Sequence, residues 1–264
     1  MSVEHKARKR FGQNFLVDQH IIGRIVAAVG ASSEDNLIEI GPGTAAITEH
    51  LLTQCPTMTV IELDRDLIKF LTAKFSQYPE MKIVNGDALT TDFSQFYGGR
   101  ELRLVGNLPY NISTPLLFHL LGSGHIKDMH FMLQREVVDR LGASPGTKSY
   151  GRLSVMIQYH CRVMPLIPVP PESFRPAPKV QSAVVRLKPH KIKPFVATNE
   201  LLLGKIVNLC FQQRRKTLRN CLKLYSDHLA DIESLVDLTM RPERLSVSDF
   251  VAITNAIDQL VENS

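Results

Sequence analysis

Apolar and polar residues in the first part of the chain repeat with two alternating periods. Short continuous apolar runs, typical of buried strands, are each followed by a stretch whose apolar residues recur every three or four positions, as in a helix. The strand-like runs cover residues 36–40, 58–63, 81–88, 101–107, 128–134 and 180–189, and the helical stretches cover residues 21–29, 44–55, 65–75, 113–121 and 135–142. This alternation predicts an α/β fold with a parallel sheet that helices cover on both faces.

The pattern changes near residue 190. Residues 168–180 contain five prolines, which make this segment extended and stiff. After Pro194 the apolar spacing is helical as far as the C-terminus. We therefore predict two domains: an α/β domain over residues 1–190, which includes a basic N-terminal arm, and a smaller all-α domain over residues 191–264.

A polar stretch lies where the strand at 101–107 ends. Residues 105–114 read VGNLPYNIST, and because Asn, Gly and Pro are common turn residues, a simple turn is the plainest interpretation. Ser113 or Thr114 is expected to cap the following helix, with Pro115 in its first turn. In parallel sheets, however, ligands bind beyond the carboxyl ends of strands, so the neighbouring strand ends decide between a turn and a binding site.

Three neighbouring strand ends carry residues that suit a nucleoside. The stretch EIGPGTAAIT (39–48) places a Gly-x-Gly turn between a strand and a helix, where a ligand can approach the backbone closely. Ala46 replaces the third glycine of a dinucleotide fingerprint, so this motif alone is weak. Glu62 can accept hydrogen bonds from ribose hydroxyls and Asp87 from an adenine amino group, although either carboxylate alone could simply be solvated.

Together these features predict a pocket for an adenosine that is not joined to a pyrophosphate, and S-adenosylmethionine fits that description. Its methyl group needs a nucleophile, and the exocyclic nitrogen of adenine is a poor one because its lone pair is delocalised into the ring. Such an amine needs hydrogen-bond acceptors rather than a strong base. The side-chain oxygen of Asn107 and the carbonyl of Leu108 can accept, while Pro109 fixes the backbone and Tyr110 stacks on the base.

Length and composition mainly exclude other classes of protein. The 264 residues, 44% of them hydrophobic, suit one large domain or a domain with a smaller appendage. No apolar run approaches a membrane span, and the basic N-terminus lacks the apolar segment of a secretory signal. The four cysteines form no CxxC pair, so we expect free, mostly buried thiols in a reducing compartment, the cytoplasm. No cluster of Cys and His indicates a bound metal, and nothing in the sequence demands more than a monomer.

Basic charge is concentrated in two segments of the chain. Residues 1–10 hold four Lys or Arg and one Glu, and residues 191–225 hold eight Lys or Arg and one Glu. Residues 226–264, in contrast, hold two Arg and eight acidic residues. Such clustering suits a polyanion such as RNA, although a solvated helix face and a tail would look the same.

The stretch QRRKTLRNCLK (213–223) predicts how the second basic segment is arranged. Arg215, Arg219 and Lys223 recur every fourth residue, so on one continuous helix they would form a stripe suited to phosphate groups. The acidic residues that follow are expected on solvated helix faces turned away from RNA.

Several longer motifs follow one another along almost the whole chain. They are FGQNFL (11–16), EIGPG (39–43), IELD (61–64), GDA (86–88), NLPYNIS (107–113), PPESFRPAPKVQSAVV (170–185) and FQQRRKTLRN (211–220). Through them the chain resembles the adenine-N6 dimethyltransferases of ribosomal RNA. The similarity is greatest to the bacterial members that dimethylate two adjacent adenosines in the 3′-terminal hairpin of small-subunit (16S) rRNA. The macrolide-resistance enzymes, which act on large-subunit rRNA, share the early motifs but match the last two less closely.

The resemblance implies a Rossmann-like S-adenosylmethionine-dependent methyltransferase domain over residues 1–190 and a helical RNA-binding domain over residues 191–264. It also implies a role in small-subunit biogenesis, with rRNA in an immature small subunit as the partner. For the cofactor it implies that Asn14 and Leu16 close over S-adenosylmethionine and that Gly41 lies against its methionine part.

The resemblance carries further roles for residues of the same pocket. Glu62 would bind the ribose of the cofactor and Asp87 its adenine amino group. One departure from the pattern is Ala45, where many relatives have glycine; we expect the extra methyl group to tighten the turn slightly and cofactor binding to persist.

For the acceptor side, the resemblance implies that Asn107, Leu108, Pro109 and Tyr110 form the pocket for the target base and that Asn107 also touches the cofactor. Phe174 would reach the base from the opposite side, although a plain core role is the alternative. The residues implied in RNA binding are Arg214, Arg215, Lys216, Arg219 and Lys223.

Three other functions stay open at the level of sequence. The chain could methylate adenine N6 in large-subunit rRNA or DNA instead. It could be an assembly factor whose main task is to bind immature small subunits. An NAD-dependent oxidoreductase fits poorly, because the third glycine is missing and no proton donor is expected near the strand ends.

Overall fold

The computed structural model describes residues 14–213 and 215–262 and divides them into two compact units. The first unit comprises the described residues up to Val138 together with Met164–Pro189. The second comprises Asp139–Val163 together with the described residues from His190 onward. Helices long and apolar enough to cross a membrane do not occur among the described residues. All four cysteines are free and buried, which confirms the prediction from sequence.

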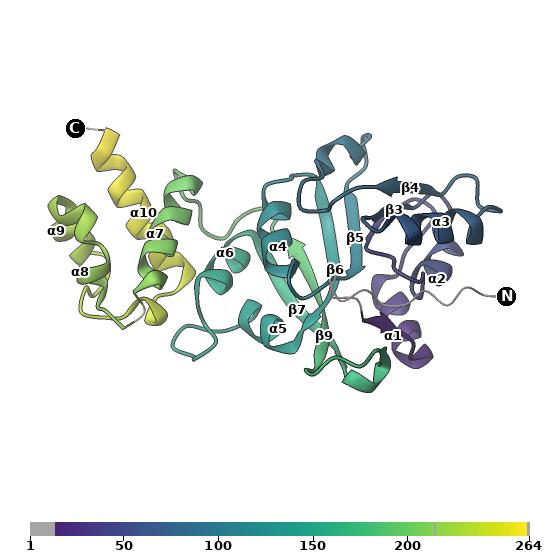
Figure 1. Ribbon diagram of the computed structural model, residues 1–264. Coiled ribbons are helices and arrows are strands. Elements are labelled where there is room, and N and C mark those ends of the chain that lie inside the picture. The colour runs from purple at the N-terminus through teal and green to yellow at the C-terminus, as the bar shows by residue number, and fades with distance from the viewer. Residues whose placement is uncertain (1–13, 214, 263–264) are drawn as a thin grey trace. The chain divides into compact units, whose positions relative to one another are not determined.

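A seven-stranded sheet organises the first unit (Figure 1). Its strands, in spatial order, are β4 (Lys82–Asn85), β3 (Thr59–Glu62), β2 (Asn36–Ile40), β5 (Leu102–Asn107), β6 (Ile126–Gln134), β9 (Ser182–Pro189) and β7 (Cys161–Val169). The five strands from β4 to β6 are parallel, whereas β9 runs antiparallel to β6. The predicted α/β class is confirmed, but the sheet is mixed rather than wholly parallel.

Strand β7 was not predicted from sequence. Its residues, CRVMPLIPV, include Pro165 and Pro168 and do not alternate clearly between apolar and polar. Proline cannot donate to a ladder of hydrogen bonds and is therefore tolerated on edge strands. The position of β7 at the end of the sheet explains how these prolines are accommodated.

Helices of the first unit connect the strands and supply part of its core. They are α1 (Gln19–Val29), α2 (Thr48–Leu52), α3 (Arg65–Lys74), α4 (Ser113–Leu121) and the start of α5 (Arg135–Leu141), with short 3-10 turns η2 (Phe93–Phe96) and η3 (Pro171–Ser173). A separate two-stranded sheet pairs β1 (Phe15–Leu16) with β8 (Phe174–Arg175). Asp18 caps α1 by accepting hydrogen bonds from the backbone amides of His20 and Ile21.

Two helix starts differ from the predictions. Helix α2 is shorter than the predicted 44–55 because Ala45 has a left-handed φ of 69°, which a continuing helix cannot include. At α4 the N-cap residue is Ile112, so the prediction of Ser113 or Thr114 was wrong. The hydroxyl of Ser113 donates instead to the carbonyl of Tyr110 at 3.1 Å, inside the preceding turn.

The second unit is helical, and residues 139–163 belong to it. Its elements are the end of α5, α6 (Arg152–His160), α7 (Glu200–Gln212), α8 (Leu218–Cys221), η4 (Lys223–His228), α9 (Leu229–Glu233), η5 (Pro242–Arg244) and α10 (Val247–Glu262) (Figure 1). The hydroxyl of Tyr159 donates to Glu200 at 3.0 Å and accepts from the amide of Ala197 at 3.2 Å. The ring of Tyr150 packs edge-on against Phe211. These contacts hold α6 to α7, which is why this division differs from the single boundary predicted near residue 190.

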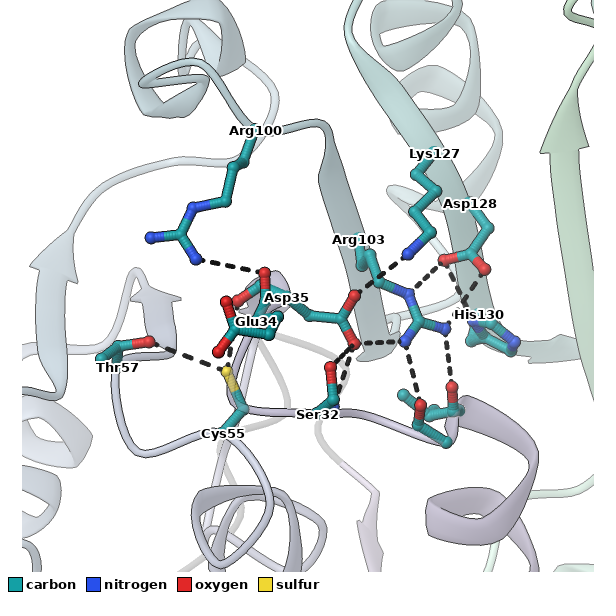
Figure 2. Close-up of polar contacts among 12 residues, drawn as sticks. Ser32, Glu34, Asp35, Cys55, Thr57, Arg100, Arg103, Lys127, Asp128 and His130 are labelled. Atoms are coloured by element: carbon teal, nitrogen blue, oxygen red, sulfur yellow. Dashed lines mark hydrogen bonds and ion pairs between the residues drawn. The ribbon is translucent and has the colours of Figure 1, made fainter.

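A buried network of charges ties four elements of the first unit together (Figure 2). Asp128 on β6 is fully buried and accepts from Arg103 on β5 at 3.0 Å and from Arg186 on β9 at 2.6 Å. Arg103 also donates to Asp35, just before β2, at 2.8 Å. Burial of Asp35 acts to raise the pKa of its carboxyl group, but hydrogen bonds from Arg103 and Lys127 outweigh it and lower that pKa to about 2. The charges are therefore paired and ionised at neutral pH.

His130, beside this network on β6, is predicted to make stability depend on pH. Burial is the main cause that lowers the pKa of His130 from 6.5 to about 4. The positive charges of Arg186 and Arg103 act in the same direction, whereas the negative charge of Asp128 opposes the shift. Because the folded pKa lies below the unfolded one, the unfolded state takes up a proton first as the pH falls. The stability contributed by neutral His130 is present above pH 6.5 and is lost towards pH 4. The loss should reach about 3 kcal/mol.

Urea unfolding between pH 4 and 7 measures this effect. The variant His130→Gln should show a shallower loss of unfolding free energy with acidification, whereas His20→Gln, at an exposed position on α1, should follow the native curve. An equally steep pH dependence in His130→Gln would show that this histidine is not responsible.

Candidate active site

The carboxyl ends of β2, β3, β4 and β5 open into one cavity of the first unit. It is lined by residues 14–16, 39–44, 46–47, 61–63, 86–89 and 107–112. The cavity brings together nine of the residues predicted from sequence: Asn14, Leu16, Gly41, Glu62, Asp87, Asn107, Leu108, Pro109 and Tyr110. The parallel pairing of the four strands places their ends at one edge of the sheet, which is the physical reason for this convergence.

The Gly-x-Gly turn forms one wall of the cavity with left-handed backbone. Gly41 has a φ of 67° and Gly43 a φ of 57°, conformations that favour glycine. The amide of Gly41 donates to the carbonyl of Ile61 at 2.9 Å, and the amide of Gly43 donates to Glu62 Oε2 at 3.3 Å. The turn is thereby fixed to the end of β3 and leaves its own backbone accessible from the cavity.

Two carboxylates stand at the ends of the next two strands. Glu62 Oε1 accepts from the amides of Leu63 and Asp64, each at 2.9 Å, and burial raises the pKa of Glu62 although these hydrogen bonds oppose it. Asp87 Oδ1 accepts from the amide of Leu89 at 2.9 Å. Both side chains are held by backbone amides, which makes them pre-oriented acceptors for hydroxyl or amino groups in the cavity.

The turn after β5 is held by one hydrogen bond to β6 and by two local ones within residues 109–113. The amide of Leu108 donates to the carbonyl of Met132 on β6 at 3.2 Å, the amide of Ile112 donates to the carbonyl of Pro109 at 3.1 Å, and the Ser113 hydroxyl binds the carbonyl of Tyr110. This turn therefore extends the β5–β6 ladder by one residue and then folds back rigidly at the cavity.

Asn107 is oriented by the chain segment around β1. Its Nδ2 donates to the backbone carbonyl of Asn14 at 3.0 Å. No donor binds Asn107 Oδ1 in the part of the chain that the structure describes, so this oxygen is the acceptor that the side chain offers at the cavity. The nitrogen of the amide therefore holds the carbonyl of residue 14 and leaves the oxygen to face the cavity.

Tyr110 presents a neutral phenol. Its hydroxyl lies 2.8 Å from Ser182 Oγ, and burial raises the pKa of the phenol although that hydrogen bond opposes the shift. The group is protonated at neutral pH and is suited to stacking and hydrogen bonding rather than to acting as a base.

Three residues of the site were missed from sequence. Gly106 is required because a Cβ there would lie 2.5 Å from the carbonyl oxygen of Ile40, and the glycine in VGNLPY was its only signal. Glu39 lines the cavity with 2% exposure, and burial raises its pKa to about 7; its signal was an acid within the apolar run NLIEI. Ser182 is far from the turn in sequence, so no local pattern could have connected it to Tyr110.

The structure does not bring Phe174 to the cavity. Its side chain is 1% exposed and belongs to the hydrophobic core, and its backbone pairs with Leu16 in the β1–β8 sheet. In this arrangement Phe174 supports the strand that carries Leu16, and its predicted contact with the target base stays a prediction.

The basic residues of the second unit are exposed but do not form the predicted stripe. Helix α7 ends at Gln212 and α8 begins after its N-cap Thr217, so the interpretation of 213–223 as one helix was wrong. Residues Arg215, Lys216, Arg219 and Lys223 are exposed, whereas Arg214 and the basic segment 1–10 lie outside the described residues. Arg219 pairs with Glu233, so the acidic segment is not wholly turned away from the basic one.

A Rossmann-like sheet with a Gly-x-Gly turn and acidic strand ends on one cavity fits an enzyme with a nucleoside cofactor, and the similarity to known proteins shows that its class is the methyltransferases. The family within this class is also shown. The chain belongs to the ribosomal RNA adenine dimethylases, whose family model matches residues 4–259.

Relatives and solved structures agree with this assignment. The chain is 57% identical over 256 residues to ribosomal RNA small subunit methyltransferase A of Saccharophagus degradans, which covers 96% of this chain and 95% of that protein. It is 52% identical to the protein of the same name from Pseudomonas putida over 98% of this chain and 97% of that one. A dimethyladenosine transferase from Plasmodium falciparum is structurally similar, with a TM-score of 0.77, 25% identity and coverage of 94% of this chain and 98% of that one. The 23S rRNA methyltransferase ErmE shares the fold, with a TM-score of 0.71, 24% identity and coverage of 93% and 100%.

Proposed function

We propose that this protein uses S-adenosylmethionine to dimethylate N6 of two adjacent adenosines in the 3′-terminal hairpin of small-subunit (16S) rRNA, within an immature small subunit. The observation that carries the proposal is the free Asn107 oxygen beside Leu108, Pro109 and Tyr110 on the same cavity as Glu62 and Asp87. The family and the relatives named for small-subunit rRNA support the choice of RNA. The enzyme acts as a cytoplasmic monomer.

The cavity suits the cofactor residue by residue. Glu62 accepts from the ribose hydroxyls, Asp87 accepts from the adenine amino group, and the backbone at Gly41 lies against the methionine part. Leu16, held by the β1–β8 pairing, and Asn14, whose carbonyl accepts from Asn107 Nδ2, close over it. When bound, S-adenosylmethionine supplies a methyl group on a positively charged sulfur.

The turn after β5 holds the acceptor amine. Asn107 Oδ1 and the Leu108 carbonyl accept its N–H bonds and favour tetrahedral geometry at nitrogen, while Tyr110 stacks on the extruded base. An uncharged amide is preferable to a carboxylate here, because a negative charge beside the cofactor's positive charge would stabilise the ground state as well as the transition state. The proton leaves to water after transfer.

RNA is positioned by charge outside the cavity. The exposed residues Arg215, Lys216 and Lys223 suit phosphate groups, which fix the position of an RNA without reading its sequence. Arg219 shares its charge with Glu233, so its contribution is smaller. Arg214 and the basic segment 1–10 add to the same attraction by their charge alone.

Mass spectrometry of rRNA tests the proposed substrate. Small subunits from cells lacking this gene are incubated with the purified protein and cofactor, in parallel with large-subunit rRNA and duplex DNA. We expect two neighbouring N6,N6-dimethyladenosines to form in the small-subunit rRNA alone. Methylation of large-subunit rRNA or DNA in preference to small subunits would contradict the proposal.

A further inference from the structure

The hydroxyl of Tyr110 contacts a residue that is distant in sequence. Its partner is Ser182, 72 residues away, at 2.8 Å, and neither hydroxyl has another partner among the described residues. Ser182 is the first residue of β9, is 1% exposed, and pairs with Gln134 at the end of β6. The serine is therefore fixed by the sheet, independently of the turn that carries Tyr110.

This contact fixes the second end of the Tyr110 ring. At the near end, the backbone is fixed by the Ser113 hydroxyl on the Tyr110 carbonyl and by the ring of Pro109. At the far end, the phenol is half-buried and Ser182 is buried, so each hydroxyl would lose a hydrogen bond that water could not easily replace if they separated. The position and direction of the ring's long axis at the cavity are set by both ends together.

We propose that Ser182 is a positioning residue of the acceptor pocket: its hydroxyl holds the far end of the Tyr110 ring, and so keeps the ring at the place where the target adenine stacks. The inference rests on the proposed function, since it requires Tyr110 to contact the base. Ser182 itself touches neither substrate nor cofactor and acts only through Tyr110.

The two methyl transfers should depend on this contact to different degrees. Adenosine offers two N–H bonds to the Asn107 oxygen and the Leu108 carbonyl, whereas N6-methyladenosine has only one left. The second transfer therefore relies more on stacking to hold the nitrogen in line with the cofactor's methyl group. Loss of the Ser182 hydroxyl should slow the second transfer more than the first, and N6-methyladenosine should accumulate.

Single-turnover rates of both transfers on small subunits that lack the modification test this inference. We expect Ser182→Ala and Tyr110→Phe each to lower the ratio of second to first rate about fivefold, as for one lost hydrogen bond. The double variant should be no worse than either single one, because all three remove the same contact. Ser182→Thr keeps the hydroxyl and should restore the native ratio.

A matched control separates positioning from stability. Ser154 in the second unit is also fully buried, and its hydroxyl donates to the carbonyl of Arg140 at 2.6 Å. Its oxygen also accepts from the amide of Gly151 at 3.1 Å, so Ser154→Ala loses two hydrogen bonds and is a demanding control for stability. Any loss of folded enzyme should slow both transfers equally and leave their ratio unchanged. Tyr110→Phe removes the contact from the other side, so the test stands even where Ser182→Ala folds poorly.

The outcomes distinguish this inference from the proposed function. A native ratio in Ser182→Ala and Tyr110→Phe, with activity lost in Tyr110→Ala, would overturn the role of Ser182 alone. Multiplying effects in the double variant would overturn it too, since the two residues would then act separately. Full activity in Tyr110→Ala would instead remove Tyr110 from the acceptor pocket, and the proposed pocket would fall with it.

Discussion

Replacing Asn107 with alanine is expected to reduce methylation at least about a hundredfold while cofactor affinity stays within a few-fold of native. The substitution removes the oxygen that accepts from the target amine, a polar group directed at the site of bond formation, and such groups contribute effects on the order of a hundredfold or more. The proposed contacts of Glu62 and Asp87 with the cofactor remain, and on the cofactor side only the hydrogen bond from Nδ2 to the Asn14 carbonyl is lost. Rates are measured on small subunits, and affinity by calorimetry with S-adenosylhomocysteine.

A second asparagine of the same cavity provides the control. Asn111 lines the cavity four residues further on and is exposed, so Asn111→Ala should keep most of the activity. Unchanged dimethylation by Asn107→Ala would remove the acceptor role of this amide. A large loss of cofactor affinity with the chemical rate intact would make Asn107 a cofactor residue instead.

Replacing Asp128 with alanine is expected to destabilise the protein by about 3–5 kcal/mol, the usual result when one partner of a buried ion pair is removed. Arg103 is buried and would keep its charge with only Asp35 to balance it (Figure 2). Arg186 would lose the carboxylate it binds. Chemical denaturation of the purified variant measures the change in unfolding free energy.

The neighbouring residue Lys127 gives a matched comparison. Its side chain is 50% exposed and binds Asp35 at 3.1 Å, so Lys127→Ala should cost less than about 1 kcal/mol. Equal losses of unfolding free energy in Asp128→Ala and Lys127→Ala would mean that burial of the network does not determine its contribution to stability.

The sheet and the cavity were predictable for one physical reason. Strands β2, β3, β5 and β6 are buried along most of their length, and their apolar runs mark them in the sequence, whereas β4 at the edge of the sheet is only partly buried. Once those strands are parallel, their carboxyl ends meet at one edge, and the residues after each strand converge. Glu62, Asp87 and Asn107 could therefore be assigned to one cavity before any coordinates were known.

The features that sequence did not predict depend on tertiary contacts. The break between α7 and α8 is absent from a helical pattern that continues through Thr217, and the grouping of α6 with the C-terminal helices depends on Tyr159 and Tyr150. The need for Gly106 arises from the carbonyl of Ile40 on a neighbouring strand. The burial of Phe174 also depends on a tertiary contact. A family motif assigned this residue to the target base, and only the pairing of β8 with β1 places it beside Leu16 in the core.

The most direct test is a crystal structure of the protein with S-adenosylmethionine bound. Our account predicts that the carbon to be transferred points into the space between Asn107 Oδ1, the Leu108 carbonyl and the Tyr110 ring. A bound cofactor whose reactive carbon faces away from those three groups would contradict it.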